Sequence, residues 1–232
     1  MSESSAVVPQ HIGIILDGNR RWAKAKNLPA FEGHRQGYET FKKTAVAAFD
    51  KGVSCVSAYI FSTENWTREK PEVNFLLDLA LRMVTRDLSE LNEHGIRIVW
   101  FGSAERVSDK LLKALRNAEE ATKHNKGRTL VICFNYGGKL EITEAVKKLV
   151  NDGVAGDDIT EEKISDYLYE PSVPPVDLLI RTSGEQRISN FMLWRAAYSE
   201  LYFTEVLWPD FSTDDLDDAL QHYASRQRRF GT

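Results

Sequence analysis

Short apolar runs alternate along the chain with longer segments that have the hydrophobic period of a helix. Short apolar runs are typical of strands that are buried on both faces, and strands that alternate with helices indicate a parallel sheet. The pattern therefore predicts a single α/β domain with a mainly parallel central sheet of about six strands, flanked by helices. The expected strands are residues 11–16, 53–61, 96–101, 130–135, 176–181 and a short strand within 201–208.

The chain of 232 residues is long enough for a sizeable core and short enough for one domain. We expect a flexible N-terminal segment over residues 1–10 and one folded domain over 11–232. Surface loops are expected at 151–158 and 170–175. The expected helices lie near residues 35–50, 73–93, 105–124, 139–151, 161–168, 189–198 and 213–227.

The charges nearly balance, with 30 basic and 34 acidic residues and a formal net charge of -4. No global positive field would draw the chain to nucleic acid, so any anion site must be local. Cys55 and Cys133 lie in separate apolar runs without the spacing of a zinc site or a disulfide framework, which favours buried reduced thiols. Because no run of about 18 uncharged apolar residues occurs, we expect a cytoplasmic protein, with at most a peripheral contact to the inner face of the membrane.

The first apolar run leads directly into Asp17, Gly18, Asn19, Arg20 and Arg21. Ligands of open parallel sheets bind beyond the carboxyl ends of the strands. Glycine lets the backbone approach an oxyanion, a following helix N-terminus offers free N–H groups, and arginine binds phosphate oxygens bidentately. The loop is therefore a candidate diphosphate cradle. The Asp-Gly pair alone also fits an ordinary turn with a capping aspartate, although the two adjacent arginines favour the phosphate site.

Two further strand ends carry arginine and hydroxyl groups. Residues 62–68 follow the second apolar run, and they also fit an N-cap for the helix that begins after Pro71. Residues 181–190 follow the fifth run with two arginines and intervening serines, and they also fit a solvated loop in which Ser189 caps a helix. Because the carboxyl ends of parallel strands meet at one edge of the sheet, the three loops together predict a crevice for two diphosphates.

A series of short motifs runs along the chain: HIGIILDGNRRW at 11–22, EGH at 32–34, FSTENW at 61–66, NYGG at 135–138, DLLIRTSGE at 177–185, RISNF at 187–191 and LWPD at 207–210. In order and spacing, from about His11 to Gly231, these motifs resemble those of the cis-prenyltransferases, and most of all the bacterial undecaprenyl diphosphate synthases. The resemblance implies that residues 11–232 form a Mg²⁺-dependent catalytic domain. It implies cis addition of isopentenyl diphosphate units to an allylic diphosphate such as farnesyl diphosphate. The expected product is a polyprenyl diphosphate such as undecaprenyl diphosphate, a lipid carrier for cell-wall synthesis.

The resemblance also assigns roles to single residues. It implies that Asp17 is catalytic and that Asp17 and Glu200 hold Mg²⁺. It implies a part for Asn65 in proton abstraction, but a neutral amide is too weakly basic to take a proton unaided, so we expect Asn65 to orient a substrate or to relay the proton. The implied substrate-binding residues are Gly18, Asn19, Arg20 and Arg21 around the allylic diphosphate, Arg181, Arg187 and Ser189 around the isopentenyl diphosphate, and Trp22, His34, Ser62, Thr63, Glu64, Trp66, Arg68 and Ile188.

The segment 73–91 is apolar on more than one face of a helix. This composition fits the wall of a hydrocarbon tunnel and equally a helix inside an ordinary core, and the resemblance favours the tunnel. Leu130 matches a family position near the tunnel floor. Two positions depart from the family pattern, since Ala30 stands where arginine is frequent and Ile60 stands where alanine is common. One phosphate contact is therefore missing in this hypothesis, and the bulk of Ile60 weighs against an eleven-unit product.

Two charged clusters resemble sites of other proteins. Residues 214–218, DDLDD, imitate the aspartate-rich motif of the trans-prenyltransferases, but those enzymes are all-helical and carry a second such motif. Acidic residues in the first turn of a helix, with Thr213 as its cap, account for this cluster. Arg226, Arg228 and Arg229 form a basic tail, for which stabilisation of a helix C-terminus is favoured over nucleic-acid binding.

Two other functions compete with the enzyme hypothesis. A non-catalytic subunit of the same fold would bind an active prenyltransferase, but such subunits have lost catalytic motif residues that are present here. A generic phosphate-binding α/β hydrolase would release phosphate from simple esters. The chain has no G-x-G-x-x-G and no Walker A motif, so a dinucleotide or ATP site has no support. The resemblance also implies a homodimer, for which residues 194–208 are either the interface or ordinary core.

Overall fold

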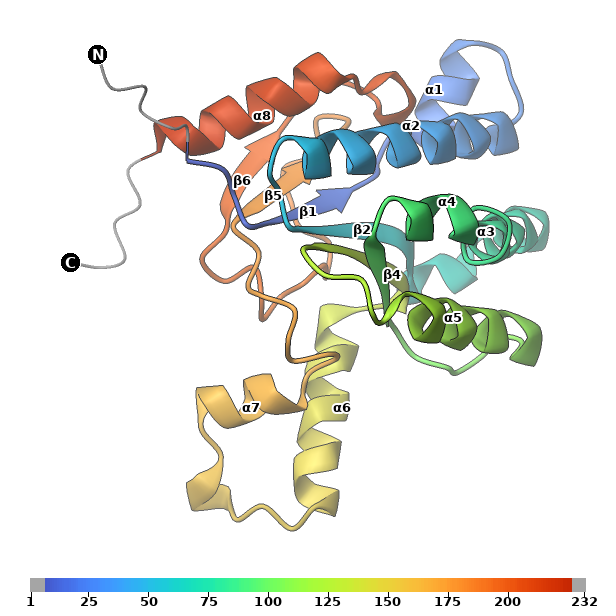
Figure 1. The fold of residues 1–232 in the computed structure, drawn as a ribbon. Helices are drawn as coiled ribbons and strands as arrows, with labels where there is room; N and C mark the ends of the chain where they lie inside the picture. Colours follow the sequence, from blue (N-terminus) through green and yellow to red (C-terminus); the bar gives the residue numbers. More distant parts are fainter. Residues whose placement is uncertain (1–6, 227–232) are drawn as a thin grey trace, which may run out of the picture.

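A six-stranded parallel sheet lies at the centre of the protein (Figure 1). The computed structural model describes residues 7–226. The strand order is β3-β4-β2-β1-β5-β6 and every neighbouring pair is parallel, which confirms the predicted α/β fold. The strands are β1 (His11–Ile15), β2 (Cys55–Ser62), β3 (Ile96–Phe101), β4 (Arg128–Tyr136), β5 (Leu178–Arg181) and β6 (Glu200–Phe203).

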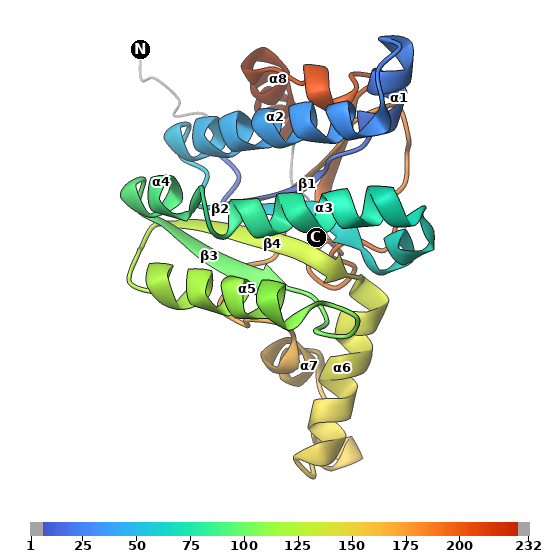
Figure 2. The ribbon, with the colours of Figure 1, turned by 90° about the vertical axis from the view of Figure 1, so that its right-hand side faces the viewer.

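Helices connect the strands except β5 and β6, which are joined by turns, and α6 with α7 extends away from the sheet (Figures 1 and 2). Among the helices of residues 7–226, none is both long enough and apolar enough to span a membrane. The helices are α1 (Asn19–Ala25), α2 (Ala30–Asp50), η1 (Thr63–Thr67), α3 (Lys70–Met83), α4 (Leu88–Glu93), α5 (Asp109–Thr122), α6 (Gly138–Asn151), η2 (Gly156–Asp158), α7 (Glu161–Tyr167), η3 (Trp208–Asp210) and α8 (Thr213–Ser225), where η denotes a 3-10 helix.

The sheet carries a hydrophobic core on each face. On one face, Ile12 and Ile14 of β1 pack in a cluster that includes residues of α2, α3, α5 and α8. On the other face, Leu179 of β5 packs in a cluster that includes Phe191 and Met192 from the segment between β5 and β6. Because both faces are covered, β1 is buried at every residue, which explains its uninterrupted apolar run. Cys55 and Cys133 are buried and free, as predicted.

The helix predicted at 189–198 is wrong, because this segment folds as a series of turns. Ser189, Asn190 and Met192 have positive φ angles of 48°, 64° and 50°, which a right-handed helix does not contain. Phe191 and Met192 are fully buried against the sheet. The apolar pattern that suggested a helix therefore reflects the packing of an irregular segment, and Ser189 does not cap a helix.

Three other helices differ from prediction at their ends. The helix expected at 73–93 is divided into α3 and α4, with Asp87 at the N-cap position of α4. The Asp87 side chain makes no capping bond, because it accepts a hydrogen bond from the hydroxyl of Tyr38 instead. The cap of α8 is Ser212 rather than Thr213, since the Ser212 hydroxyl accepts a hydrogen bond from the Asp215 N–H at 3.2 Å. Helix α2 begins earlier than expected, and the short α1 lies outside the expected helices.

The two ends of the chain are only partly described. Residues 1–6 of the expected flexible segment, and Arg228 and Arg229 of the basic tail, lie outside the described residues. The N–H of Gln10 donates to the Asp177 carboxylate at 2.8 Å, so the last residue of that segment is anchored to the sheet. Arg226 forms an ion pair with Glu200 at 3.7 Å.

Candidate active site

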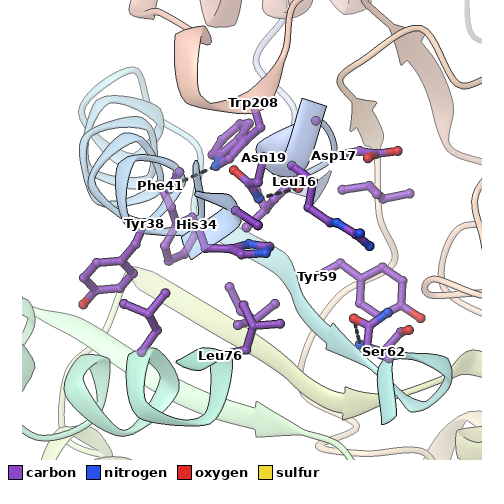
Figure 3. Close-up of a pocket in the computed structure, with 18 of the residues that line it drawn as sticks. Leu16, Asp17, Asn19, His34, Tyr38, Phe41, Tyr59, Ser62, Leu76 and Trp208 are labelled. Carbon is purple, nitrogen blue, oxygen red and sulfur yellow. Dashed lines mark hydrogen bonds between the residues drawn. The ribbon is translucent and has the colours of Figure 1, made fainter. Parts of the chain in front are cut away.

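A cavity of about 1220 Å³ opens where β1, β2 and β5 end (Figure 3). Pockets for drug-sized ligands are usually about 300–1,000 Å³, so this cavity has room for a larger ligand. Polar residues line the part at the strand ends, and Figure 3 shows Asp17, Tyr59 and Ser62 at that end. Apolar residues line the part between α2 and α3, namely Phe41, Ile60, Leu76, Leu79, Ala80 and Met83.

Asp17 follows β1 and meets Arg181 at the end of β5, because the parallel register pairs Ile15 with Arg181. The Arg181 guanidinium donates to the Asp17 carboxylate at 2.8 Å, and Arg21 lies 3.5 Å from its other oxygen. Partial burial raises the pKa of Asp17, but the hydrogen bond and charge of Arg181, with Arg21, outweigh it and hold that pKa below its ordinary value. Asp17 is therefore an ionised carboxylate at neutral pH, already paired with two guanidiniums.

Arg181 also organises the loop that follows β5. Its guanidinium donates to the Ser189 hydroxyl at 2.6 Å and to the Arg187 carbonyl at 2.5 Å. The positive φ of Ser189 turns the chain so that both acceptors face the guanidinium. Arg181 and Ser189 line the cavity as predicted, whereas the exposed Arg187 side chain pairs with Glu185 at 2.5 Å and is not among the lining residues.

A second ionic cluster surrounds Glu72, a residue that the sequence interpretation missed. The Glu72 carboxylate accepts hydrogen bonds from Arg68 at 2.9 Å and from His34 at 3.1 Å, and it lies 3.8 Å from Arg20. Burial, the largest effect, lowers the pKa of His34 despite the nearby carboxylate, so the ring is neutral at neutral pH. The i, i+4 spacing of Arg68 and Glu72 at the start of α3 was the one local signal for this contact.

Asn65 lies in η1, and its side chain is committed to a capping box. The Asn65 side-chain oxygen accepts a hydrogen bond from the Ser62 N–H at 3.1 Å, while the Ser62 hydroxyl accepts one from the backbone N–H of Asn65. Ser62 is thus a cap, although of η1 and not of the helix that follows. Because the side-chain oxygen holds the cap, the NH₂ group is a donor that Asn65 can offer to a ligand in the cavity.

Close helix contact fixes the loop that contains Gly18 and Asn19. A Cβ at Gly33 would lie 2.0 Å from the Asn19 carbonyl oxygen, and a Cβ at Gly37 would lie 2.1 Å from its side-chain oxygen. The two glycines of α2 therefore let α1 rest directly on α2. Gly18 itself has a φ of 112°, which a residue with a side chain rarely adopts.

The structure sorts the predicted site residues into two groups. Twelve line the cavity: Asp17, Gly18, Asn19, Arg20, Arg21, His34, Ser62, Glu64, Asn65, Arg68, Arg181 and Ser189. Trp22, Thr63, Trp66, Arg187 and Ile188 are not among the lining residues. The Trp22 indole donates to Asp210 at 2.6 Å and the Trp66 indole to Asn135 at 2.7 Å, so both fasten loops that border the cavity. Ile188 packs in the core on the other face of the sheet.

Glu200 does not lie beside Asp17 within one chain. It begins β6, where it pairs with Leu178, whereas Arg181, the partner of Asp17, pairs with Phe203 at the other end of β6. The separation of three strand residues is about 10 Å. Across residues 7–226, no group of three or more His, Cys, Asp or Glu side chains could hold a metal ion. The separation along β6 weighs against the pairing of Asp17 with Glu200 on one metal of a single chain, and that pairing stays a prediction.

The α3 helix forms part of the cavity wall and also part of the core, the two alternatives that its composition left open. Leu76, Leu79, Ala80 and Met83 line the cavity, while Val73 belongs to the core with Leu76, Ala80 and Met83. Ala30 and Ile60, which depart from the family pattern, also line the cavity. Leu130 is buried in the same core cluster as Leu76 and Ala80 and is not among the lining residues, so its place near the tunnel floor stays a prediction.

Comparison with known proteins identifies the family. Residues 15–231 match the family model described as putative undecaprenyl diphosphate synthase. The isoprenyl transferase of Thermotoga maritima is 46% identical over 226 residues, which cover 97% of both chains. The ditrans,polycis-undecaprenyl-diphosphate synthase of Legionella pneumophila, specific for (2E,6E)-farnesyl diphosphate, is 46% identical, covering 97% of this chain and 96% of that protein. The lavandulyl diphosphate synthase of Lavandula x intermedia, solved with dimethylallyl diphosphate, superposes with a TM-score of 0.93 at 36% identity, covering 97% of this chain and 99% of that one. The cavity and these similarities agree, and the chain belongs to the undecaprenyl diphosphate synthase family of cis-prenyltransferases.

Proposed function

We propose that the chain adds isopentenyl diphosphate units in cis to an allylic diphosphate such as farnesyl diphosphate, giving a polyprenyl diphosphate. One observation carries the proposal: a single cavity joins a cationic mouth at the strand ends to an apolar interior between α2 and α3. A prenyl diphosphate has the same division, with a highly charged head and a hydrocarbon tail. The names of the relatives, which are prenyl and polyprenyl diphosphate synthases, support the same substrate class.

The charge of the cavity favours diphosphates, although the whole chain is slightly acidic. Arg20, Arg21, Lys24, Arg68 and Arg181 are five cationic lining residues, against the two carboxylates of Asp17 and Glu64. Arginine and lysine can bind phosphate oxygens directly. As the allylic C–O bond breaks, negative charge grows on the leaving diphosphate and positive charge on the allylic carbon. Guanidiniums held by Glu72 and Asp17 are already oriented before that charge develops, which is the basis of electrostatic preorganisation.

The residues present fit a Mg²⁺ ion that is shared with a substrate. Magnesium is usually bound by one or two carboxylates together with substrate phosphates and water, so a cluster of protein ligands is not required. Asp17 is ionised and lines the cavity, and its guanidinium partners can move to phosphate oxygens when a diphosphate binds. In this proposal Asp17 holds the ion, which supplies positive charge to the departing diphosphate. Glu200 of the same chain takes no part.

Asn65 orients a substrate in this proposal. Its NH₂ group is the side-chain donor left free by the capping box, so it can hold a diphosphate oxygen near the isopentenyl unit that loses a proton. The attack of the isopentenyl double bond on the allylic carbon leaves positive charge on the isopentenyl unit, which loss of that proton removes. A neutral amide is too weakly basic to accept the proton itself.

A homodimer in the cytoplasm, with peripheral membrane contact for product release, belongs to the same proposal. The edge strand β6 offers a surface for a second copy, because Leu201 is 42% exposed and the nearby Tyr198 is 80% exposed. Trp208 is fully buried beside α2, so only part of the segment 194–208 is available for an interface. Sedimentation of the purified chain tests the dimer, and a monomer at micromolar concentration would contradict it.

The function is tested by incubating the purified chain with farnesyl diphosphate and labelled isopentenyl diphosphate, with and without Mg²⁺. We expect a labelled prenyl product that is extractable into organic solvent and that disappears when the metal is chelated and returns when Mg²⁺ is restored. Absence of product from the chain alone, with or without detergent, would favour the non-catalytic subunit. Release of phosphate from simple esters without prenyl product would favour the hydrolase.

A further inference from the structure

Tyr38 lies at the end of the cavity that is remote from Asp17. In Figure 3 the two side chains lie at opposite sides of the cavity, with the Tyr38 ring beyond His34 and the Tyr38 hydroxyl turned away from Asp17. The ring lines the cavity, yet only 7% of the residue is exposed. Protein atoms therefore cover most of the ring, and its apolar surface is the part that a ligand in the cavity would contact.

The Tyr38 hydroxyl is fixed from behind by a buried carboxylate. It donates a hydrogen bond to Asp87, which lies between α3 and α4 and is 9% exposed. The same Asp87 oxygen lies 3.8 Å from the Arg82 guanidinium and 4.0 Å from the Lys42 ammonium. Glu39 pairs with both cations, at 3.6 Å each. A compact ionic cluster thus stands directly behind the ring.

This arrangement makes the end wall different from the side walls. The hydroxyl stays protonated, because burial and the Asp87 carboxylate both raise the pKa of Tyr38. A hydrocarbon that advanced past the ring would break the hydrogen bond between the buried hydroxyl and the Asp87 carboxylate and would lie against buried charges. The side walls offer only apolar contacts from residues such as Leu76 and Ala80, which can adjust without loss of a hydrogen bond.

We propose that Tyr38, held in place by Asp87, is the stop that sets the length of the prenyl chain. The proposal rests on the proposed function and names the residue that decides its product. Tyr38 lines the cavity directly, so a hydrocarbon that extends toward the end remote from Asp17 meets its ring. The α2 helix supplies the stop and α3 with its following turn supplies the anchor.

The test is the chain length of the product, measured by chromatography of the dephosphorylated alcohols after incubation with farnesyl diphosphate and isopentenyl diphosphate. Tyr38→Ala removes the ring, and Tyr38→Leu shortens it while keeping apolar packing. We expect the main product of both variants to gain one or more isoprene units over that of the unchanged chain. Tyr38→Phe keeps the ring without its tether, so we expect part of its product to shift in the same direction.

Leu179→Ala is the matched control, because it also removes buried apolar volume, but from the core on the other face of the sheet and not from the cavity lining. We expect its product length to be unchanged. Unaltered product length in both Tyr38→Ala and Tyr38→Leu, or equal lengthening in Leu179→Ala, would overturn the proposal. A Tyr38→Phe product identical to that of the unchanged chain would show that the hydrogen bond to Asp87 has no part in setting the chain length. Failure of the unchanged chain to make any prenyl product would refute the proposed function instead.

Discussion

The Asp17→Asn substitution tests the candidate site most directly, because it keeps the shape of the side chain and removes its charge. In the folded protein the Asp17 carboxylate accepts a hydrogen bond from Arg181 at 2.8 Å and faces Arg21 at 3.5 Å. The Arg181 side chain is only 5% exposed, so the substitution leaves a buried guanidinium with less compensation. We therefore expect both the stability and the activity of the protein to fall.

The expected loss of stability is modest. A hydrogen bond between charged groups contributes about 1.5–3 kcal/mol. Because the Asp17 side chain is 31% exposed and Arg181 keeps its bonds to the Arg187 carbonyl and the Ser189 hydroxyl, we expect the free energy of unfolding to fall by about 1–2 kcal/mol. The kcat should fall further, by roughly 100- to 1,000-fold, as found when one preorganised electrostatic contact to a transition state is removed.

The stability difference should depend on pH with a defined sign. The pKa of Asp17 is lower in the folded chain than in the unfolded chain, where it is about 3.9. The contribution of the ionised Asp17 carboxylate to the free energy of unfolding is therefore fully present above about pH 4. It is lost as the pH falls through the lowered pKa that Asp17 has in the folded chain. Urea denaturation at pH 7 and near pH 3 should show a gap between Asp17→Asn and the unchanged chain that narrows in acid.

Asp50→Asn is the control for loss of a carboxylate, since Asp50 pairs with Arg128 on the surface at 3.1 Å with its side chain 61% exposed. Its free energy of unfolding should change by no more than about 0.5 kcal/mol and its kcat should be unchanged. A normal kcat in Asp17→Asn would show that the carboxylate is not part of the site. A gap that stays constant between pH 7 and pH 3 would show that Asp17 is not ion-paired in solution.

Three further substitutions test other parts of the structure. Gly37→Ala would place its Cβ 2.1 Å from the side-chain oxygen of Asn19 in α1, so the free energy of unfolding, measured by thermal denaturation, should fall by about 1–3 kcal/mol. Gly156→Ala is its control, because a Cβ there meets no atom within 4 Å and the stability should be unchanged. Glu72→Gln weakens the ion pairs that orient Arg20 and Arg68, so steady-state kinetics should show a kcat/KM lower by about tenfold and a raised KM. An unchanged KM would contradict this. Glu141→Ala leaves the buried Arg195 unpaired, and urea denaturation should report a loss of about 3–5 kcal/mol; a loss below about 1 kcal/mol would refute the pairing.

The sheet and the loops at its carboxyl edge could be predicted because local pattern determines both. An apolar run marks each buried strand, and parallel strands end at the same edge, so Asp17 and Arg181 come together although they are 164 residues apart. Any residue that directly follows a strand end could be placed in this way. Residues that reach the site from the side of a helix could not.

Glu72 and Asp87 are examples of such residues. Glu72 bonds to His34 across 38 residues, and Asp87 bonds to Tyr38 across 49 residues, so no local period reports either contact. Glu72 lies in the first turn of α3 and Asp87 at the N-cap position of α4, where the expected functions of an acidic residue are capping or solvation. The wrong helix at 189–198 has a related cause, since burial against a sheet and one face of a helix produce similar apolar spacing.

Helix α3 is joined to α2 by polar contacts near its two ends, through Glu72 with His34 and through Asp87 with Tyr38. Between them, the lining surface of α3 consists of Leu76, Leu79, Ala80 and Met83, which offer a chain no hydrogen bond to break. Dispersion contacts are non-directional, so methyl branches can exchange one set of neighbours for another at little cost. We therefore expect a hydrocarbon to slide along this surface of α3 with little resistance until it reaches the proposed stop at Tyr38.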